Sequence, residues 1–293
     1  MKCAFVTIIG RASVGKSTLL NKMCGEKVAI VSNVPQTTRN AIRGIVNRKE
    51  GQLIFVDTPG RHLSEKKMNK KLMEVSNRSL ADSDLVLYIL DAFRAPGAEE
   101  EEIVSILAGV TEKTIAAVNK MDVPQADFNR AKEFLSLHLP SVAEKNIFAI
   151  SAETGSGIDE MLAALYEMAP EGQPLYDNEY YTDQETDFRI AEIIREQAII
   201  RLRQELPHSL YVEIADMEFK EEKLWVRAFI MVERESQKGM VVGKGGEVIK
   251  AIRLGALKEL KKIFDWKIDL DLRVKTGKDW RQKDHTLKRI IDR

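Results

Sequence analysis

The sequence Gly-Arg-Ala-Ser-Val-Gly-Lys-Ser at residues 10–17 decides the fold of the first half of this chain. It fits the phosphate-binding pattern G-x-x-x-x-G-K-[ST], and the apolar residues 2–9 before it predict a buried strand. A helix is expected to begin near Gly15, so the motif has the strand and the helix that it requires. Its glycines let consecutive backbone N–H groups curl around phosphate oxygens at the positive end of a helix. This context disfavours the alternative interpretation, a glycine-rich turn with a chance lysine.

Two side chains of the loop have predicted roles in binding a nucleoside triphosphate. We expect Lys16 to reach the β- and γ-phosphates and the Ser17 hydroxyl to bind Mg²⁺. The predicted nucleotide-binding residues of the loop are Gly10, Ser13, Val14, Gly15, Lys16, Ser17 and Thr18.

A second motif, Asp-Thr-Pro-Gly at residues 57–60, ends the apolar stretch 53–56. An aspartate at a strand end beside the phosphate loop can hold Mg²⁺ through water, which is the role predicted for Asp57. The backbone N–H of Gly60 is expected to contact the γ-phosphate. Alone this sequence is an ordinary turn, but its place after the loop and its helix strengthens the prediction.

Two further motifs predict that the base is guanine. The sequence Asn-Lys-Met-Asp at residues 119–122 follows an apolar strand, and Asp122 would accept hydrogen bonds from guanine N1–H and N2–H₂. Adenine lacks that donor pair and would leave the carboxylate unpaired. Asn119 is expected to brace the phosphate loop, and Lys120 to lie along the base.

The last of these motifs follows the apolar residues 146–150 and consists of Ser151, Ala152 and Glu153, with the Ala152 N–H predicted to donate to guanine O6. All four motifs lie where predicted strands end, which is the ligand-binding edge of an open α/β sheet. The first half is therefore predicted to be a GTPase domain of α/β class, with a mostly parallel sheet and helices on both faces.

The sequence Val-Pro-Gln-Thr-Thr-Arg at residues 34–39 is predicted to form the loop that closes over Mg²⁺ and the γ-phosphate. A threonine in such a loop binds the metal only while the γ-phosphate is present. Thr37 and Thr38 both qualify, and Thr38 is favoured because Thr-Arg is the commoner ending of such loops in related GTPases.

Composition limits what else this chain can be. At 293 residues it has room for two domains, and its 44% hydrophobic and 31% charged residues are typical of a globular protein. No apolar run approaches the roughly 18 residues of a membrane span, and the early first strand predicts no signal peptide. Two cysteines suit a reducing cytoplasm. Residues 238–293 hold 16 Lys and Arg against 8 Asp and Glu, a net charge of +8 in a neutral chain, which predicts an anion-binding surface there.

The second half is predicted to be a smaller α+β RNA-binding domain. We place the boundaries at 1–168 for the GTPase domain, 169–186 for a linker and 187–293 for the second domain with its tail. A G-x-x-G loop between helices, as at residues 243–246, is the RNA clamp of KH domains, and the order α-β-β-α-α-β fits the bacterial type. A glycine-rich helix connection is the simpler alternative. The predicted RNA-binding residues are Val242, Gly243, Lys244, Gly245, Gly246 and Lys250.

From residue 2 to residue 278 the chain resembles the Era family of bacterial ribosome-assembly GTPases, in which a GTPase domain precedes a type II KH domain. The resemblance implies GTP or GDP with Mg²⁺ as ligands, binding of the 3′ end of 16S rRNA, and a role in maturation of the 30S subunit. It also implies a cytoplasmic protein with peripheral inner-membrane contact. The oligomeric state stays open, with a monomer favoured.

Two departures from the family pattern matter. Ala12 and Ser13 replace a Pro-Asn pair whose asparagine helps hold K⁺ in related GTPases, so K⁺ as a further cofactor is in question. Arg61 stands where the family is usually apolar; it is interpreted as a solvated arginine, with an internal arginine finger as the alternative. His62 receives no catalytic role. With no evident water-positioning side chain, we expect slow intrinsic hydrolysis that a partner accelerates.

GTP is expected to order residues 33–40 and 60–70, to change how the two domains pack, and so to couple nucleotide state to RNA affinity. Two alternatives stay open: an RNA-binding assembly chaperone in which hydrolysis is vestigial, and a membrane-associated cell-cycle regulator for which RNA is incidental.

Overall fold

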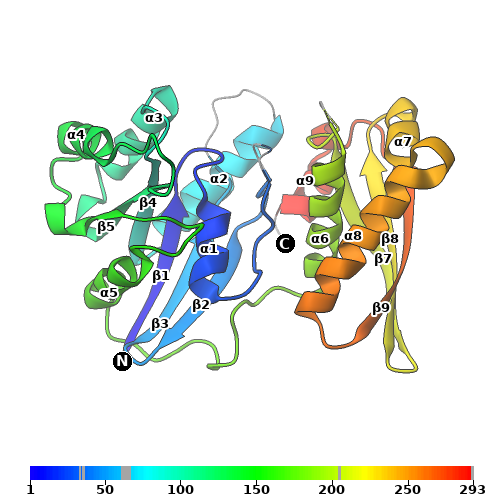
Figure 1. Cartoon of the computed structure of the whole chain (residues 1–293), viewed down its shortest axis with the longest axis horizontal. Coiled ribbons are helices and arrows are strands. Elements are labelled where there is room, and N and C mark those ends of the chain that lie inside the picture. The colour runs from blue at the N-terminus through cyan, green and yellow to red at the C-terminus, as the bar shows by residue number, and fades with distance from the viewer. Residues whose placement is uncertain (33, 35–36, 61–66, 204–205, 292–293) are drawn as a thin grey trace. The chain divides into compact units, whose positions relative to one another are not determined.

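The computed structural model describes residues 1–32, 34, 37–60, 67–203 and 206–291. The chain divides into two compact units (Figure 1). The first contains residues 1–29 and 38–183, and the second contains residues 30–37 and 184–293. The short segment 30–37 therefore belongs with the C-terminal half of the chain, although it precedes most of the first unit in sequence.

The first unit is built on a six-stranded sheet with the order β2-β3-β1-β4-β5-β6, in which only β2 runs antiparallel to its neighbour. Its strands are β1 (Lys2–Ile9), β2 (Ile42–Arg48), β3 (Gly51–Asp57), β4 (Leu85–Asp91), β5 (Thr114–Asn119) and β6 (Ile147–Ala149). Its helices are α1 (Lys16–Cys24), α2 (Lys67–Ala81), α3 (Ala98–Leu107), α4 (Phe128–His138) and α5 (Ile158–Met168). The mostly parallel sheet predicted from the sequence is confirmed.

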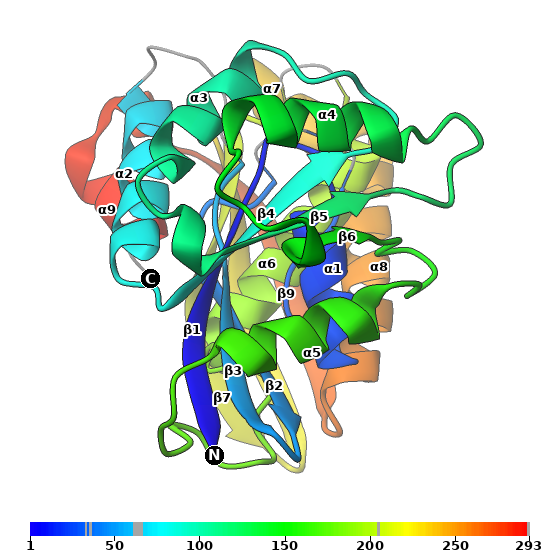
Figure 2. The ribbon, with the colours of Figure 1, turned by 90° about the vertical axis from the view of Figure 1, so that its left-hand side faces the viewer.

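Helices cover both faces of this sheet, and the central strands are correspondingly buried. All residues of β3, β4 and β5 are buried, the pattern of parallel strands with a layer on each side. In Figure 2, α2 and α3 lie on one side of the sheet and α1 and α5 on the other. The carboxyl ends of β1, β3, β4 and β5 meet at one edge, which brings the sequence motifs together.

The segment after α5 runs along β2, the edge strand of the sheet. The N–H of Ile45 donates to the carbonyl oxygen of Tyr181 at 2.9 Å, and the Thr182 hydroxyl donates to the carbonyl oxygen of Arg43 at 2.8 Å. On β3, the amide of Gln52 bonds the backbone of residues 175–176. The predicted linker is thus attached to the first unit up to residue 183.

The second unit combines a three-stranded sheet, of order β7-β8-β9, with helices packed on one face. Its strands are β7 (Leu210–Lys220), β8 (Lys223–Val232) and β9 (Lys267–Thr276). Its helices are α6 (Thr186–Arg201), α7 (Glu235–Val242), α8 (Glu247–Ile263) and α9 (Asp284–Ile291). Strand β8 pairs antiparallel with β7 and parallel with β9.

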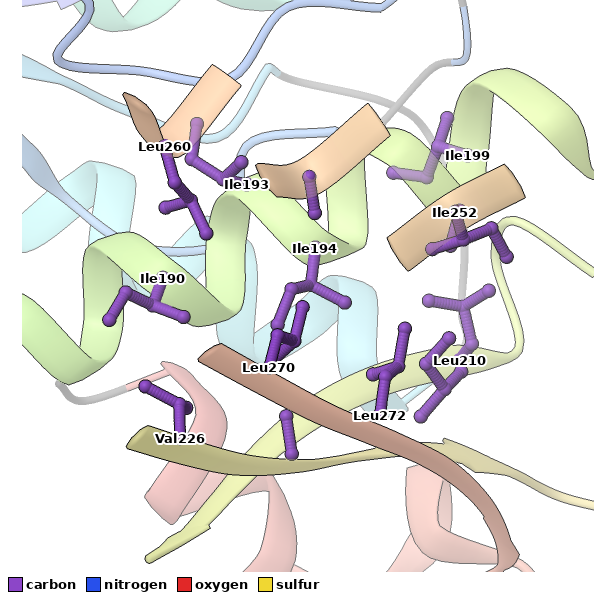
Figure 3. Packing of buried hydrophobic residues seen from close by; sticks show 14 of the residues in the cluster. Ile190, Ile193, Ile194, Ile199, Leu210, Val226, Ile252, Leu260, Leu270 and Leu272 are labelled. Carbon is purple, nitrogen blue, oxygen red and sulfur yellow. The ribbon is translucent and has the colours of Figure 1, made fainter. Parts of the chain in front are cut away.

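The core of the second unit lies between the sheet and the helices α6 and α8. Figure 3 shows the isoleucines of α6 pointing toward residues of β8, β9 and α8. Members of this cluster that are at most 3% exposed include Ile190, Ile193, Ile194, Ile199, Leu210, Val226, Ile252, Leu260 and Leu270. Ile30, from the short N-terminal segment, is part of the same cluster.

Two element boundaries differ from those that the sequence pattern predicts, which are a strand over 209–217 with a charged turn over 218–223, and a helix capped by Asp187. Strand β7 continues to Lys220, so only Glu221 and Glu222 form the turn to β8; the charged end of β7 is exposed and hides the alternation that marks a strand. Helix α6 begins at Thr186, one residue before the expected cap. In the part of the chain with defined positions, no helix is long and apolar enough to cross a membrane.

Candidate GTP site and RNA-binding loop

The phosphate loop between β1 and α1 has a backbone that only glycine allows at two positions. A Cβ at Gly10 would lie 2.6 Å from the carbonyl oxygen of Ile89, and one at Gly15 would lie 2.4 Å from Asn119 Nδ2. Gly15 also has φ +102°, in the left-handed region that favours glycine. The loop is therefore closely surrounded.

Side chains bond the carbonyl oxygens of residues 10–14 of the loop. Lys16 Nζ donates to the carbonyls of both Gly10 and Arg11 at 2.9 Å. The carbonyl oxygens of residues 12, 13 and 14 accept from Arg94 Nη2 at 3.0 Å, Lys120 Nζ at 2.9 Å and Asn119 Nδ2 at 2.9 Å. With its acceptors bonded, the loop offers N–H groups, and such a concave array binds anions.

Oxygen atoms from three separate elements converge at the start of α1. Ser17 Oγ lies 2.6 Å from Asp57 Oδ2, at the end of β3, and 2.9 Å from Thr38 Oγ1. The second Asp57 oxygen, Oδ1, is buried and has no hydrogen-bond partner within the described ranges. Hydroxyl and carboxylate oxygens are the ligands that Mg²⁺ takes, so these residues fit the metal.

The two threonines of the loop before β2 point to different partners. The Thr37 hydroxyl lies 2.5 Å from Ser32 Oγ and donates to the carbonyl oxygen of Val34 at 2.6 Å. Thr38 Oγ1 faces the metal-binding group and lies 3.5 Å from Asp57 Oδ2. Of the two, Thr38 has the geometry of a metal ligand.

Burial shapes the ionisation of the two charged groups here. Burial lowers the pKa of Lys16 below its usual value, although the nearby carboxylates of Asp57 and Glu100 act against this shift. Burial likewise raises the pKa of Asp57, opposed by Lys16 and by the Ser17 and Thr38 hydroxyls. Each group therefore depends on the other for its charge.

Gly60 lies against the phosphate loop, as its predicted γ-phosphate contact requires. A Cβ at Gly60 would be 2.9 Å from the Ala12 Cα and 3.1 Å from Lys16 Nζ. Arg61 and His62, which the sequence analysis discussed, lie outside the described residues, as do Pro35 and Gln36.

The residues predicted to bind the base form a second hydrogen-bonded group. Asn119 connects the phosphate loop to the segment that contains Ala152. Its Nδ2 donates to the carbonyl oxygen of residue 14 in the loop, and its Oδ1 accepts from the Ala152 N–H at 2.8 Å. That N–H, expected to bond guanine O6, is thus bonded to Asn119. Ser151 Oγ lies 2.5 Å from Asp122 Oδ1 and orients this exposed carboxylate. Glu153 is exposed.

Asp91, at the end of β4, is a site residue that the sequence analysis missed. Its side chain is fully buried, and its Oδ2 accepts from Lys120 Nζ at 2.8 Å and from Arg94 Nε at 3.2 Å. Burial alone would raise the pKa of Asp91, but the Lys120 hydrogen bond and the N–H groups of Arg94 and Phe93 outweigh it, so the pKa lies below its usual value. Its position at the same strand edge as the other motifs was the available signal.

The glycine-rich loop of the second unit joins α7 to α8. Gly243, Gly245 and Gly246 all have positive φ, of 76°, 60° and 80°. A Cβ at Gly243 would lie 2.5 Å from Val248 Cγ2, whereas one at Gly245 or Gly246 would meet nothing within 4 Å. Lys244 and Lys250 are exposed, and Val242 is half-buried. The loop thus presents open backbone and two cations at the start of α8.

Comparison with known proteins identifies both domains. Residues 5–120 match the family described as 50S ribosome-binding GTPase, and residues 205–281 match the KH domain family. GTPase Era of Treponema denticola is 52% identical over 99% of both chains, and GTPase Era of Borreliella burgdorferi is 46% identical over all of both.

Two solved structures have nearly the same fold. Aquifex aeolicus Era bound to GDP.AlF4- superposes with a TM-score of 0.93 at 33% identity, covering 99% of each chain. Era in complex with MgGDPNP and nucleotides 1506–1542 of 16S ribosomal RNA gives a TM-score of 0.94 at 33% identity, covering 99% of this chain and 98% of that one. With relatives of 46–52% identity over nearly its whole length, the chain belongs to the Era family of GTPases.

Proposed function

We propose that this GTPase is a molecular switch that binds the 3′ end of 16S rRNA through its KH domain and assists maturation of the 30S subunit. The observation that carries the proposal is the pairing, in one chain, of a braced phosphate loop with an exposed G-x-x-G loop followed by a helix. A relative of 33% identity binds nucleotides 1506–1542 of that RNA with MgGDPNP.

In the proposed reaction, water attacks the γ-phosphorus of GTP, the bond to the β–γ bridging oxygen breaks, and GDP and phosphate leave. The loop N–H groups and Lys16 stabilise the charge on the phosphate oxygens. Ser17 and Thr38 would hold Mg²⁺ directly and Asp57 through water, and the ion would supply positive charge to neutralise the phosphates. The Gly60 N–H donates to the γ-phosphate, and this contact is lost after hydrolysis.

Guanine selection rests on Asp122, whose carboxylate is exposed and held by Ser151. Asn119 ties the base-binding segment to the phosphate loop, since one amide bonds both. Guanine O6 would then share the Ala152 N–H with Asn119. Binding of K⁺ as a further cofactor would depend on the hydroxyl of Ser13, an exposed residue of the phosphate loop.

For RNA, the proposal assigns the sugar–phosphate backbone to Gly243–Gly246, with Lys244 and Lys250 contacting phosphates. Open space around Gly245 and Gly246 supports this role, because a backbone can approach a residue without a side chain closely. Unpaired bases would lie beside α8, in the groove of the KH domain. The same proposal includes three further features that rest on the family resemblance. They are domain limits of 1–168 and 187–293, a monomeric state, and a cytoplasmic location with peripheral membrane contact.

The decisive experiment is binding of a labelled oligonucleotide with the sequence of the 16S rRNA 3′ end to the full chain, with a GTP analogue and then with GDP. Tighter binding with the analogue is expected, because a switch couples the two affinities reciprocally. Equal affinity in both nucleotide states would contradict the switch, and absence of binding in both would contradict the RNA assignment.

The substitution Gly245→Asp supplies the matched variant. It places a carboxylate where the phosphates should lie, so binding is expected to fall at least ~30-fold, the scale of a lost charge contact plus repulsion. Gly109→Asp adds the same charge at an open position of the first unit, where a Cβ meets nothing within 4 Å. If both variants bind equally, the G-x-x-G loop is not the RNA site.

A further inference from the structure

A buried network of polar side chains joins the phosphate loop to β4 and α3, all within the first unit. Its members are Arg11 of the loop, Tyr88 of β4 and Glu100 in the first turn of α3, which are 7%, 0% and 1% exposed. Strand pairing explains how they meet, because β1 runs parallel to β4 with Ile9 opposite Tyr88, so the loop leaves its strand beside the tyrosine. Glutamate and arginine are almost never fully buried unless they are paired.

Glu100 contacts both of the other members at once. One carboxylate oxygen, Oε2, accepts from the Tyr88 hydroxyl, and the other, Oε1, lies 3.3 Å from Arg11 Nε. Burial raises the pKa of Glu100, while the Tyr88 hydrogen bond and the charges of Arg11 and Lys16 act against that shift. Because both oxygens are engaged, the carboxylate has one orientation and presents its charge to the Arg11 guanidinium.

The Arg11 guanidinium also bonds the segment that follows β4. Its Nη1 donates to the carbonyl oxygen of Ala95 and its Nη2 to that of Arg94, both at 3.2 Å. In the opposite direction, Arg94 Nη2 donates to the carbonyl oxygen of Ala12, the next residue of the loop, at 3.0 Å. The loop and this segment are therefore bonded to each other in both directions, and Glu100 supplies the charge that pairs with Arg11.

The backbone of Arg11 belongs to the part of the loop that holds Lys16. The buried Lys16 Nζ donates to the carbonyl oxygens of Gly10 and Arg11, each at 2.9 Å. The loop N–H groups predicted to bind phosphate begin two residues after Arg11. A shift of the Arg11 backbone would therefore move Lys16 and these N–H groups away from the geometry in which they are preorganised.

We propose that Glu100 is a positioning residue for nucleotide binding: held by Tyr88, it fixes the Arg11 side chain and thereby the backbone of the phosphate loop. The inference rests on the phosphate-binding role proposed above for that loop. It extends the nucleotide site to α3, a helix that none of the sequence motifs includes.

The role predicts a loss of affinity that is common to both nucleotides. A phosphate loop cradles the α- and β-phosphates, which GDP and GTP share, so a displaced loop weakens the binding of both. Loss of a switch contact would weaken only the GTP analogue. A residue that merely stabilised the fold would lower the melting temperature and leave both affinities unchanged.

The test measures the melting temperature of the full chain and its affinities for GDP and a GTP analogue, by titration calorimetry, with Glu100→Gln. This variant keeps the shape and an acceptor for Tyr88 but lacks the charge. We expect both affinities to fall about tenfold, the scale of one charge-assisted hydrogen bond. Glu101→Gln is the matched control, because it removes the same charge from an exposed residue in the same turn of α3. Unchanged affinities in Glu100→Gln, or an equal loss in Glu101→Gln, overturn the proposal.

A double variant guards against a folding defect, because Glu100→Gln alone leaves the buried Arg11 charge without its partner. Arg11→Met combined with Glu100→Gln removes both charges, so the melting temperature should be at least that of Glu100→Gln. Both affinities should nevertheless stay low, because the anchor of the loop is absent. Full nucleotide affinity in the double variant would mean that the pair only balances charge, and would contradict a positioning role.

The same variants form a double-mutant cycle that tests the route through Arg11. If Glu100 acts through Arg11, Glu100→Gln should cause no further loss of affinity in the Arg11→Met background. Losses that simply add would mean that Glu100 acts by another route, and the mechanism would be wrong.

The unmodified chain separates this inference from the proposal on which it rests. If it binds neither GDP nor the GTP analogue, the phosphate-binding role of the loop is wrong, and the role of Glu100 with it. If it binds both nucleotides and Glu100→Gln binds them equally well, the loop keeps its role and only the role of Glu100 is wrong.

Discussion

Two glycine-rich loops of this molecule, residues 10–17 and residues 243–246, are both proposed to bind phosphates, but their surroundings differ. The first is enclosed: added Cβ atoms at Gly10 and Gly15 would meet neighbours at 2.6 and 2.4 Å, and side chains from distant strands bond its carbonyl oxygens. The second is open, because a Cβ at Gly245 or Gly246 would meet nothing within 4 Å.

The ligands proposed for the two loops account for this difference. A nucleotide ends in a compact phosphate group that must be held in one geometry for a reaction, so its loop is braced before binding. An RNA backbone carries a phosphate at every step and is held through charge and close approach, without chemistry. Bracing is therefore expected where catalysis occurs, and accessibility where a polymer is gripped.

The largest expected effect comes from a methyl group in the enclosed loop. Gly15→Ala puts a Cβ against Asn119 Nδ2 at a residue with φ +102°, so the loop must deform. We expect GDP and GTP affinity to fall at least ~100-fold, the scale of a displaced preorganised site. Gly25→Ala is the control, since Gly25 has φ +70° and open space around its Cβ. Nucleotide affinities would be measured by titration calorimetry. Equal affinities of the two variants would contradict the expectation that the close surroundings of Gly15 constrain the loop.

Next in size is removal of the carboxylate that braces the loop through Lys120 and Arg94. Asp91→Asn keeps the shape but weakens two charge-assisted hydrogen bonds, so both nucleotides should bind about tenfold more weakly. Asp82→Asn, at an exposed residue that directly follows α2, should have no effect. A normal GDP affinity in Asp91→Asn would show that the bracing is dispensable.

A smaller effect is expected when a cation is removed from the open loop. Lys244→Ala should weaken RNA binding about threefold to tenfold and lower the slope of log affinity against log salt by about 0.7, the value for one single-strand phosphate contact. GTP affinity should not change. Lys49→Ala removes an equally exposed lysine from the first unit and serves as the control. An unaltered salt slope in Lys244→Ala would place this lysine away from the RNA phosphates.

The smallest effect is expected from a methyl group in the open loop, the counterpart of the first prediction. Gly245→Ala meets no atom within 4 Å and costs only the strain of φ 60°, roughly 1 kcal/mol of stability. RNA affinity should fall no more than about fivefold, since the backbone can still approach. A loss as large as that of Gly15→Ala in the other loop would mean that both loops are equally constrained.

The features that could be predicted from the sequence are those formed by a few consecutive residues. The phosphate loop, the guanine motif and the G-x-x-G loop each occupy a few neighbouring positions, and apolar strands placed the first two at one sheet edge. These features follow from local backbone chemistry, which a short pattern captures.

Contacts between distant residues escaped prediction. Asp91 pairs with Lys120 across two strands, and Arg195 reaches a carbonyl group 158 positions earlier in the chain. Neither contact has a local pattern, because a side chain's partner depends on the packed fold. The grouping of residues 30–37 with the second unit is likewise a matter of burial, since Ile30 lies in that unit's core.

The segment that runs along β2 has a consequence for solubility. A strand at the edge of a sheet exposes N–H and C=O groups that can pair with another chain and seed aggregation. Here the Ile45 N–H and the Arg43 carbonyl are already bonded to Tyr181 and Thr182. The connection between the domains therefore also covers the edge of the sheet at β2. Cutting or shortening this connection would expose a strand edge on which copies of the chain could polymerise.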